Sequence, residues 1–366
     1  MAVIKLSECI KNRVKKLRNL MKIEQIDAYI LTNVADVTYM TGFSGDDSVL
    51  VVTAKKVVLL SDSRFTEQLK QECPKLKVKL RDGSMAAAAA AVLLKDGKKG
   101  TAGVVAINEA DISVADFNAY KKSLGKGVKG ISRLINKIRM YKDDFEIAQI
   151  TKAIRIAEKS LAETLKIVKP GMTELQLAAH LEYQMQMNGA LMPGFPSIVA
   201  FGLRAAQCHA VPGSTRLKKN VPFLIDFGAK YNGYISDLTR CFCIGKIRPE
   251  FADAYKYVLE AQLKAIDTIA PGVPLADVDA AARSVIPAKM CYSHGTGHGL
   301  GLNVHEAPGF SPKATGNCEA GMVLTVEPGI YIGDKFGIRI EDDILVTAKG
   351  HKVLSKLPKG LDSVIL

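Results

Sequence analysis

Four acidic residues in the C-terminal half of the sequence form two pairs, and each pair flanks a turn-forming segment. Asp226 and Asp237 flank the Asn-Gly dipeptide at 232–233, which is the strongest short-range signal for a β-hairpin. Glu327 and Glu341 flank a second glycine-containing loop. A chain that folds back about each turn places the two carboxylates of a pair roughly opposite each other. All four residues adjoin apolar runs, so we expect them to converge where water is scarce.

Converging carboxylates require a compensating cation, because desolvation and mutual repulsion both oppose their ionisation. The histidines fit a metal site, since four of the six in the chain lie at His209, His294, His298 and His305, the last three in a glycine-rich segment. One imidazole among carboxylates is a common ligand set for manganese, cobalt or zinc, whereas all-oxygen sites suit magnesium or calcium. The other imidazoles would carry protons or donate hydrogen bonds.

The elements that must position these residues occur twice. Pro170-Gly171 and Pro271-Gly272 each end a helical pattern and precede a second one, and they are separated by the same interval as Asp226 and Glu327. The sequence therefore predicts two αβ halves related by pseudo-symmetry, each contributing two carboxylates to a shared centre.

The first part of the chain shows a different pattern. A helical signal is followed by short apolar runs at 28–32, 49–53 and 57–61, which predict an α/β layer with buried strands. A basic stretch at 131–142 leads into a long helical pattern, and we place the boundary there. The expected domains are residues 1–131 and 140–366.

Composition limits the class of protein. A length of 366 residues suggests about two domains, and 48% hydrophobic with 24% charged residues is typical of soluble globular chains. No run is long enough to span a membrane and the N-terminus lacks the order of an export signal, so a cytoplasmic protein with seven reduced cysteines is expected. The net charge of +13 comes from scattered lysines without interleaved aromatic residues, which favours a solvated surface over a nucleic-acid or membrane partner.

The motifs around these residues resemble those of the Xaa-Pro peptidases, the aminopeptidase P and prolidase branch of the pita-bread metallopeptidases. Order and spacing are retained over about residues 140–360, and the N-terminal part is similar to the smaller creatinase-type domain of the same family. The segments that carry the resemblance are Pro170-Gly-Met-Thr-Glu, Ile225-Asp-Phe-Gly-Ala, Ser236-Asp-Leu-Thr-Arg, His294-Gly-Thr-Gly-His, Val304-His-Glu, Thr325-Val-Glu-Pro-Gly and Gly337-Ile-Arg-Ile-Glu-Asp.

The resemblance implies an α+β fold, with a pita-bread catalytic domain after a smaller α/β creatinase-type domain. It implies a dinuclear site in which Asp226 chelates one metal, His298 and Glu327 bind the other, and Asp237 and Glu341 bridge them. Two divalent ions, manganese in the first place and cobalt or zinc as alternatives, would present a bridging hydroxide to the peptide bond. The implied activity is hydrolysis of the N-terminal Xaa-Pro bond of proline-containing peptides or dipeptides, by a homodimer.

The resemblance also assigns residues around the metals. The histidines His209, His294 and His305 would line the substrate cleft, with His294 or His305 stabilising the oxyanion and Glu327 shuttling the proton. Behind the ligands, the expected supporting residues are Thr239, Tyr331 and Arg339. The sequence departs from the family pattern before His209, at Phe201, Leu203 and Cys208, which puts the pocket shape in question.

Other interpretations remain open at this point. Taken singly, each acidic residue is typical of a turn or strand end and each histidine of a core or loop position, and Thr239, Tyr331 and Arg339 fit a purely structural role equally well. Methionine aminopeptidase activity is the nearest rival within the fold. Creatine amidinohydrolysis uses the fold without metals, which the filled ligand set opposes. A non-catalytic binding or chaperone module is suggested only by the net charge, and the sequence does not choose between dipeptides and longer peptides.

Overall fold

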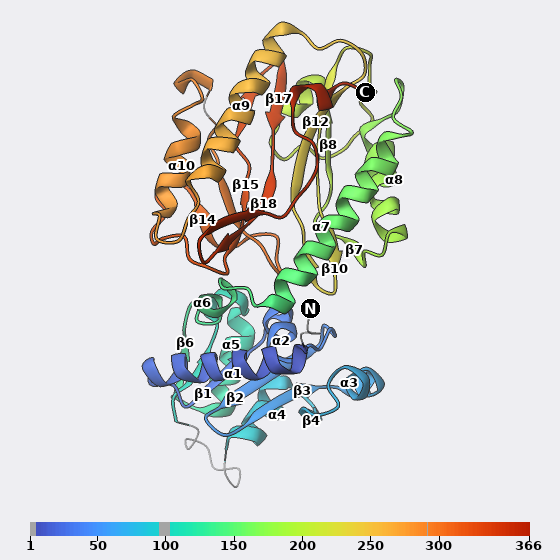
Figure 1. The fold of residues 1–366 in the computed structure, drawn as a ribbon. Helices are drawn as coiled ribbons and strands as arrows, with labels where there is room; N and C mark the ends of the chain where they lie inside the picture. The colour runs from blue at the N-terminus through green and yellow to red at the C-terminus, as the bar shows by residue number, and fades with distance from the viewer. Residues whose placement is uncertain (1–4, 95–102, 291) are drawn as a thin grey trace. The chain divides into compact units, whose positions relative to one another are not determined.

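The computed structural model describes residues 5–94, 103–290 and 292–366 (Figure 1). The chain divides into two compact units, Met1–Arg139 and Met140–Leu366. Among the helices in the described ranges, none combines the length and apolar character that a membrane span requires. Six of the seven cysteines lie in these ranges and are free thiols, while Cys291 is outside the described residues.

The first unit is built on a six-stranded sheet with the strand order β4-β3-β2-β1-β5-β6. Its central strands β1, β2 and β3 pair antiparallel, and the outer strands β4, β5 and β6 join in parallel. The apolar runs predicted as strands form the three central strands. The elements are α1 (Leu6–Ile23), β1 (Ala28–Leu31), α2 (Val34–Thr41), β2 (Ser48–Thr53), β3 (Val57–Ser61), α3 (Thr66–Glu72), β4 (Lys77–Leu80), α4 (Met85–Leu93), β5 (Val105–Ile107), α5 (Val114–Leu124), β6 (Val128–Gly130) and α6 (Asn136–Arg139).

The second unit contains the two repeated halves that the sequence predicts. The first half has α7 (Asp144–Leu165), α8 (Glu174–Met187), β7 (Met192–Pro193), β8 (Ile198–Phe201), the short 3-10 helix η3 (Gly202–Ala206), β9 (Pro222–Phe227), β10 (Ala229–Tyr231), β11 (Tyr234–Ile235) and β12 (Leu238–Cys243). The second half has α9 (Pro249–Thr268), α10 (Leu275–Arg283), β13 (Gly297–Gly299), β14 (Glu306–Phe310), β15 (Val323–Val326), β16 (Gly329–Ile332), β17 (Phe336–Arg339), β18 (Asp342–Thr347) and β19 (Gly350–Val353).

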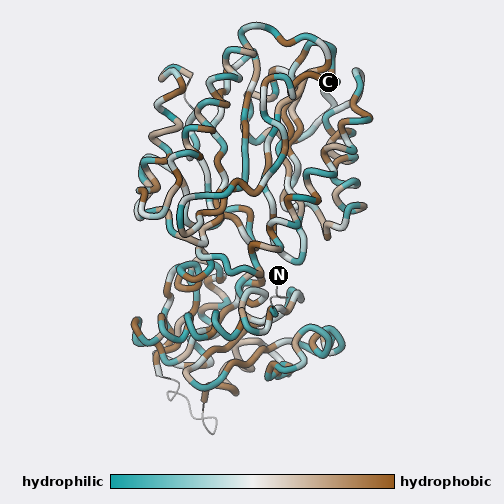
Figure 2. The backbone as a smooth tube through the Cα atoms, viewed as in Figure 1, coloured by the Kyte–Doolittle hydropathy of each residue, from teal (hydrophilic) through white to brown (hydrophobic). Residues whose placement is uncertain are grey.

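The strands of this unit lie between the two helix pairs, with α7 and α8 on one side and α9 and α10 on the other (Figure 1). The sheets have the orders β12-β9-β8 and β14-β13-β15-β18-β19, and an antiparallel bridge between Thr239 and Glu341 joins them. Apolar residues follow the strands at the centre of the unit (Figure 2). One contiguous buried cluster, which includes Phe251, Phe310 and Ile344, fills the space beneath α9 and α10.

Local sequence signals explain where the main helices begin and where the hairpins turn. Asp143 caps α7 and Thr173 caps α8, each in a reciprocal capping box. In the first hairpin Tyr231 pairs with Tyr234, and the turn residues Asn232 and Gly233 both have positive φ, as a tight two-residue turn requires. The second hairpin pairs β16 with β17 around residues 333–335. Both predicted hairpins are confirmed.

Candidate metal centre

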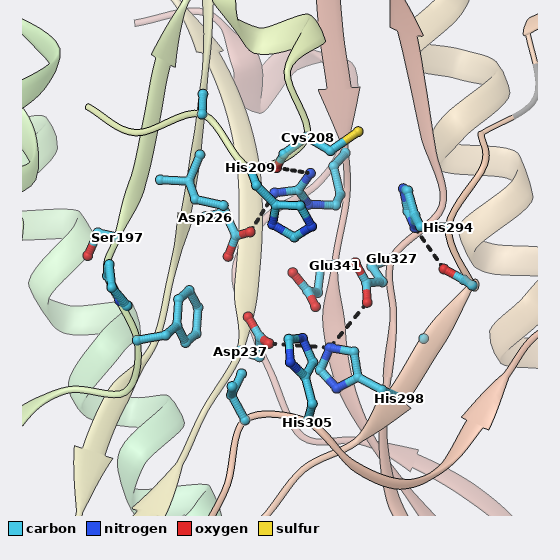
Figure 3. A pocket seen from close by; sticks show the side chains of 18 of the residues that line it. Ser197, Cys208, His209, Asp226, Asp237, His294, His298, His305, Glu327 and Glu341 are labelled. Carbon is cyan, nitrogen blue, oxygen red and sulfur yellow. Dashed lines mark hydrogen bonds and ion pairs between the residues drawn. The ribbon is translucent and has the colours of Figure 1, made fainter. Parts of the chain in front are cut away.

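The five residues expected to bind metal line one cavity of about 480 Å³ (Figure 3). Each comes from a strand or a strand end. Asp226 lies on β9 opposite Thr239, and Asp237 directly precedes β12. His298 lies on β13, Glu327 follows β15, and Glu341 is the second of the two residues between β17 and β18. The two hairpins therefore bring the acidic pairs to the same place, as the turn positions predict.

Three of these side chains form the tightest group. One ligand atom each from Asp237, His298 and Glu341 lies within 4.8 Å of the other two. Glu327 joins them through His298, with 3.3 Å between its Oε1 and the Nε2 of the imidazole, while Asp237 Oδ2 is 3.7 Å from the same nitrogen. The Nδ1 of His298 lies 3.1 Å from the carbonyl oxygen of Gly299, which can only accept. Nδ1 therefore carries the proton, and Nε2 presents its lone pair to the carboxylates.

The electrostatics of the cluster oppose the charged state in the absence of a cation. Burial, reinforced by the neighbouring carboxylates, raises the pKa of Asp237 and the pKa of Glu341 well above the usual range. Burial also raises the pKa of Glu327, and it lowers the pKa of His298. A lowered pKa keeps the imidazole neutral, which is its ligand form.

Asp226 supplies a direct test of whether a cation fits. Its Oδ2 lies 2.5 Å from Nη2 of Arg339, whereas its Oδ1 is buried and makes no hydrogen bond to the residues that the structure describes. A buried carboxylate oxygen without a donor is costly and needs a partner. An oxygen aimed into a cavity with three further carboxylates and one imidazole fits a divalent metal of the manganese, cobalt or zinc type.

The other three candidate histidines, His209, His294 and His305, line the same cavity together with apolar side chains. His209 and His305 face the carboxylates (Figure 3), and the rings of His298 and His305 lie 4.4 Å apart. Burial and the neighbouring His298 lower the pKa of His305. The apolar part of the wall comprises Phe195, Pro196, Ile198, Ala210, Val211, Pro212 and Val304. The cavity thus combines an acidic floor with an apolar wall.

Arg339 and Tyr331 connect Asp226 to His294. Nη1 of Arg339 donates to the hydroxyl of Tyr331 at 2.8 Å, and that hydroxyl lies 3.1 Å from Nε2 of His294. Since Nδ1 of His294 donates to the carbonyl of Gly295, its Nε2 accepts the proton of the tyrosine. Burial lowers the pKa of His294, which agrees with this neutral tautomer.

Thr239 supports Glu341 from behind. Its hydroxyl donates to Oε2 of Glu341 at 2.7 Å and accepts from Nε of Arg339 at 3.1 Å. Thr239, Arg339 and Tyr331 are therefore all in contact with a candidate ligand or with His294.

Of the three residues that depart from the family pattern, Cys208 lines the cavity, Phe201 is buried beside β9, and Leu203 is largely exposed.

Two residues that were not predicted from the sequence hold the segment that carries His294. Arg283 on α10 donates to the carbonyl of His294 at 2.7 Å, and its Nε donates to the buried carboxylate of Asp279 at 2.7 Å. Asp279 also accepts from the hydroxyl of Thr296 at 2.7 Å. The only sequence signal is an Asp and an Arg four residues apart on a helix, which usually marks a surface pair.

Comparison with known proteins gives consistent matches over the whole chain. The profile of metallopeptidase family M24 matches residues 148–348, and that of the Creatinase/Prolidase N-terminal domain matches residues 13–141. The chain is 34% identical over 353 residues to the uncharacterized peptidase YqhT of Bacillus subtilis, covering 95% of this chain and 99% of that protein.

Two solved structures extend the comparison to the fold. The Xaa-Pro dipeptidase from Bacillus anthracis superposes with a TM-score of 0.92 at 33% identity, covering 98% of this chain and 100% of that one. The X-Pro aminopeptidase from Thermotoga maritima superposes with a TM-score of 0.86 at 33% identity, covering 95% and 100%.

Proposed function

Because this chain belongs to metallopeptidase family M24, we propose that it is an exopeptidase that hydrolyses the N-terminal Xaa-Pro bond of peptides or dipeptides. Family membership confirms the resemblance and the fold class predicted from the sequence, a pita-bread domain after a creatinase-type domain. The observation that carries the proposal is the convergence of four carboxylates and His298 on one cavity that also holds three further histidines.

The metal ligands in this proposal are Asp226, Asp237, His298, Glu327 and Glu341, with Asp237 and Glu341 shared between two ions. The raised pKa values of Asp237 and Glu341 and the unpartnered Oδ1 of Asp226 support it. When bound, two divalent cations would supply an acidified water molecule and polarise the peptide carbonyl. Manganese is the favoured ion, with cobalt or zinc as alternatives that the same donor set accepts.

The chain's own residues provide the remaining chemistry. Glu327 accepts the proton of the attacking water and passes it to the leaving amine, for which burial and a raised pKa suit it. Of the two histidines expected to stabilise the oxyanion, His294 has both ring nitrogens engaged, so His305 donates to the substrate carbonyl while His209 lines the cleft. His294, held through Tyr331 by Arg339, keeps a fixed orientation beside them. The acidic floor attracts the terminal amine of the peptide, which accounts for cleavage at the first bond.

Two finer points belong to the proposal. A homodimer rests on the resemblance, whereas a cytoplasmic location without nucleic-acid or membrane partners rests on the composition and on the scattered lysines. Gel filtration with light scattering checks the first of these.

The decisive experiment measures hydrolysis of Xaa-Pro and Xaa-Pro-Xaa peptides after chelation and after restoring manganese, cobalt or zinc. The proposal expects turnover that vanishes with the chelator and returns with metal, and an Asp237→Asn variant without turnover. Matched Met-Ala peptides serve as the control for methionine aminopeptidase activity. Full activity in the Asp237→Asn variant would contradict the bridging role, and a binding module would show no metal-dependent turnover at all.

A further inference from the structure

The segment that carries His209 is tied to the start of α8 by one buried side chain and by a backbone hydrogen bond from the N–H of Leu175 to the carbonyl of Gly213 at 3.1 Å. This segment runs from Phe201 to Gly213 and supplies five consecutive cavity-lining residues, 208–212. Its anchor is Glu174, the last residue of the Pro-Gly-Met-Thr-Glu motif and the first of α8, whose side chain is fully buried. The metal site and the substrate histidines leave this glutamate without a role.

The Glu174 carboxylate holds both ends of the segment at once. Its Oε1 accepts from the backbone N–H of Phe201 at 2.9 Å, and its Oε2 accepts from the backbone N–H of Gly213 at 2.9 Å. Arg204, in η3 between them, donates through Nε to both oxygens at 3.0 and 2.9 Å. Nη2 of Arg204 then reaches the carbonyl of Val211 at 2.6 Å.

These contacts fix the backbone on either side of His209. The carbonyl of Cys208 accepts from Nη1 of Arg339 at 3.4 Å, and the carbonyl of Val211 accepts from Arg204. Charge-assisted hydrogen bonds of this kind are stronger than neutral ones, and a negative charge in the first turn of α8 is favourable. The capping box of α8 holds the start of the helix, so the anchor itself is rigid.

The side chain of Arg204 is essential to this arrangement because it is the positive charge that compensates a fully buried carboxylate. It is about one third exposed, whereas Glu174 is not exposed at all. Without the guanidinium, the buried Glu174 carboxylate keeps only the backbone N–H groups of Phe201 and Gly213 as donors. The carbonyl of Val211 also loses its hydrogen bond to Arg204. The expected response is movement of the segment that presents His209 to the cavity.

We infer that Glu174 and Arg204 are positioning residues for His209, and that they set the efficiency of peptide hydrolysis without contributing to metal binding. The inference rests on the proposed function, because it assigns the cavity to a peptide. It adds an ion pair outside the metal site that holds the substrate-facing wall of the cavity in place.

The test compares Arg204→Met with Arg216→Met in the metal-loaded full chain. Arg216 is a matched control, since its Nη1 donates to the carbonyl of Gly171 at 2.7 Å on the exposed surface of the same half. We expect Arg204→Met to lower kcat/KM for an Xaa-Pro-Xaa peptide by about 10- to 100-fold, and Arg216→Met to change it by less than about twofold. Metal content should equal that of the wild type in both.

A double-mutant cycle separates positioning from general damage. In a His209→Ala background, Arg204→Met should lower kcat/KM by less than about twofold, because the side chain that it positions is already absent. Fully additive effects of the two substitutions would overturn the inference, as would loss of metal from Arg204→Met.

Hydrogen exchange gives a reading that does not depend on activity. Amides in 201–213 should exchange at least about tenfold faster in Arg204→Met than in Arg216→Met, with the rest of the unit unchanged. Glu174→Gln provides a second variant, because its amide offers one acceptor oxygen in place of two. Unchanged exchange in 201–213 in both variants would refute the anchor. If the wild-type chain does not hydrolyse Xaa-Pro peptides, the proposed function is wrong. The exchange rates of amides 201–213 then test on their own whether Glu174 and Arg204 hold the segment.

Discussion

Arg240 and Asp342 form an almost completely buried ion pair, with 2.7 Å between Nη2 and Oδ1. The pair joins β12 of the first half to β18 of the second. It lies next to the candidate ligands, because Asp342 follows Glu341 and Nη1 of Arg240 donates to the carbonyl oxygens of Glu341 and Thr239. The candidate metal centre therefore lies directly beside a buried ion pair between the two halves.

Asp342→Asn should lower the free energy of unfolding of the chelated protein by about 3–5 kcal/mol, because it leaves the Arg240 charge buried without its partner. Urea denaturation at pH 7 measures this. The matched control is Asp253→Asn, which breaks an exposed pair with Lys256 and should cost less than about 1 kcal/mol. Equal losses in the two variants would contradict the structural role of the pair.

The penalty of Asp342→Asn should also depend on pH. Burial alone would raise the pKa of Asp342, but the charges of Arg240 and Lys359 outweigh it and hold the pKa below its usual range. A lowered folded-state pKa gives stability that is present above the unfolded value of about 3.9 and is lost as the pH falls below it. Urea midpoints of wild type and variant should therefore approach each other below about pH 4.

The stabilising effect of metal should shrink as the pH falls. Burial raises the pKa of Asp237 and Glu341, so the metal-free folded state binds more protons than the unfolded chain. Its stability must therefore rise as the pH is lowered from neutral toward the unfolded values of about 3.9 and 4.3. Melting temperatures with chelator and with manganese should converge between pH 7.5 and 5. A gap that widens at low pH would contradict the proposed ligand set.

Asp237→Asn should make the metal-free protein more stable while abolishing the stabilisation by metal. The substitution removes one of the carboxylates that repel each other at the buried centre. Each kcal/mol of stability gained corresponds to roughly 2–4 °C in Tm for a unit of this size. Thermal unfolding with and without manganese measures both effects. Asp334→Asn, on the β16–β17 turn, is the control and should change neither.

Tyr331→Phe should lower kcat by about 10- to 100-fold with little change in metal content. The hydroxyl of Tyr331 is the link between Arg339 and His294, and its loss frees the imidazole to rotate. Steady-state kinetics and metal analysis check this. Tyr257→Phe removes a hydroxyl from an exposed position on α9 and should leave kcat unchanged. A Tyr331→Phe variant with wild-type kcat would show that the link is structural only.

Alkylation of the folded protein should select Cys208 among the six cysteines in the described ranges. Burial raises the pKa of Cys73, Cys241 and Cys318 to about 11, which suppresses their reactive thiolates. Cys208 is half-buried and lines the cavity. Mass spectrometry after iodoacetamide treatment should find it modified first, and a bound proline peptide should slow the reaction. Labelling of Cys318 before Cys208 would contradict the arrangement.

The turns and the apolar runs made the hairpins and most of the core strands predictable. The Asn-Gly turn at 232–233 fixes the register that brings Asp226 and Asp237 together, and the repeated spacing extends the argument to Glu327 and Glu341. The reason is that hairpin geometry depends on residues close in sequence. The resemblance to the Xaa-Pro peptidases then assigned the individual roles of metal ligand and cleft residue, which the spacing of the acidic residues and histidines did not distinguish.

Contacts between distant side chains were not predictable in this way. Glu174 and Arg204 lie on different elements, and nothing in their local sequence shows that they meet. The same is true of Arg240 and Asp342, because no local sequence pattern indicates that these two charged residues form a buried ion pair. Such pairs depend on how elements pack, a property that periodicity and turn signals do not contain.

The bridge between Thr239 and Glu341 makes the candidate metal centre depend on residues that are far apart in the order of synthesis. The candidate ligands run from Asp226 in the first half of the second unit to Glu341 in the second, so the five donors can come together only after nearly the whole chain has been synthesised.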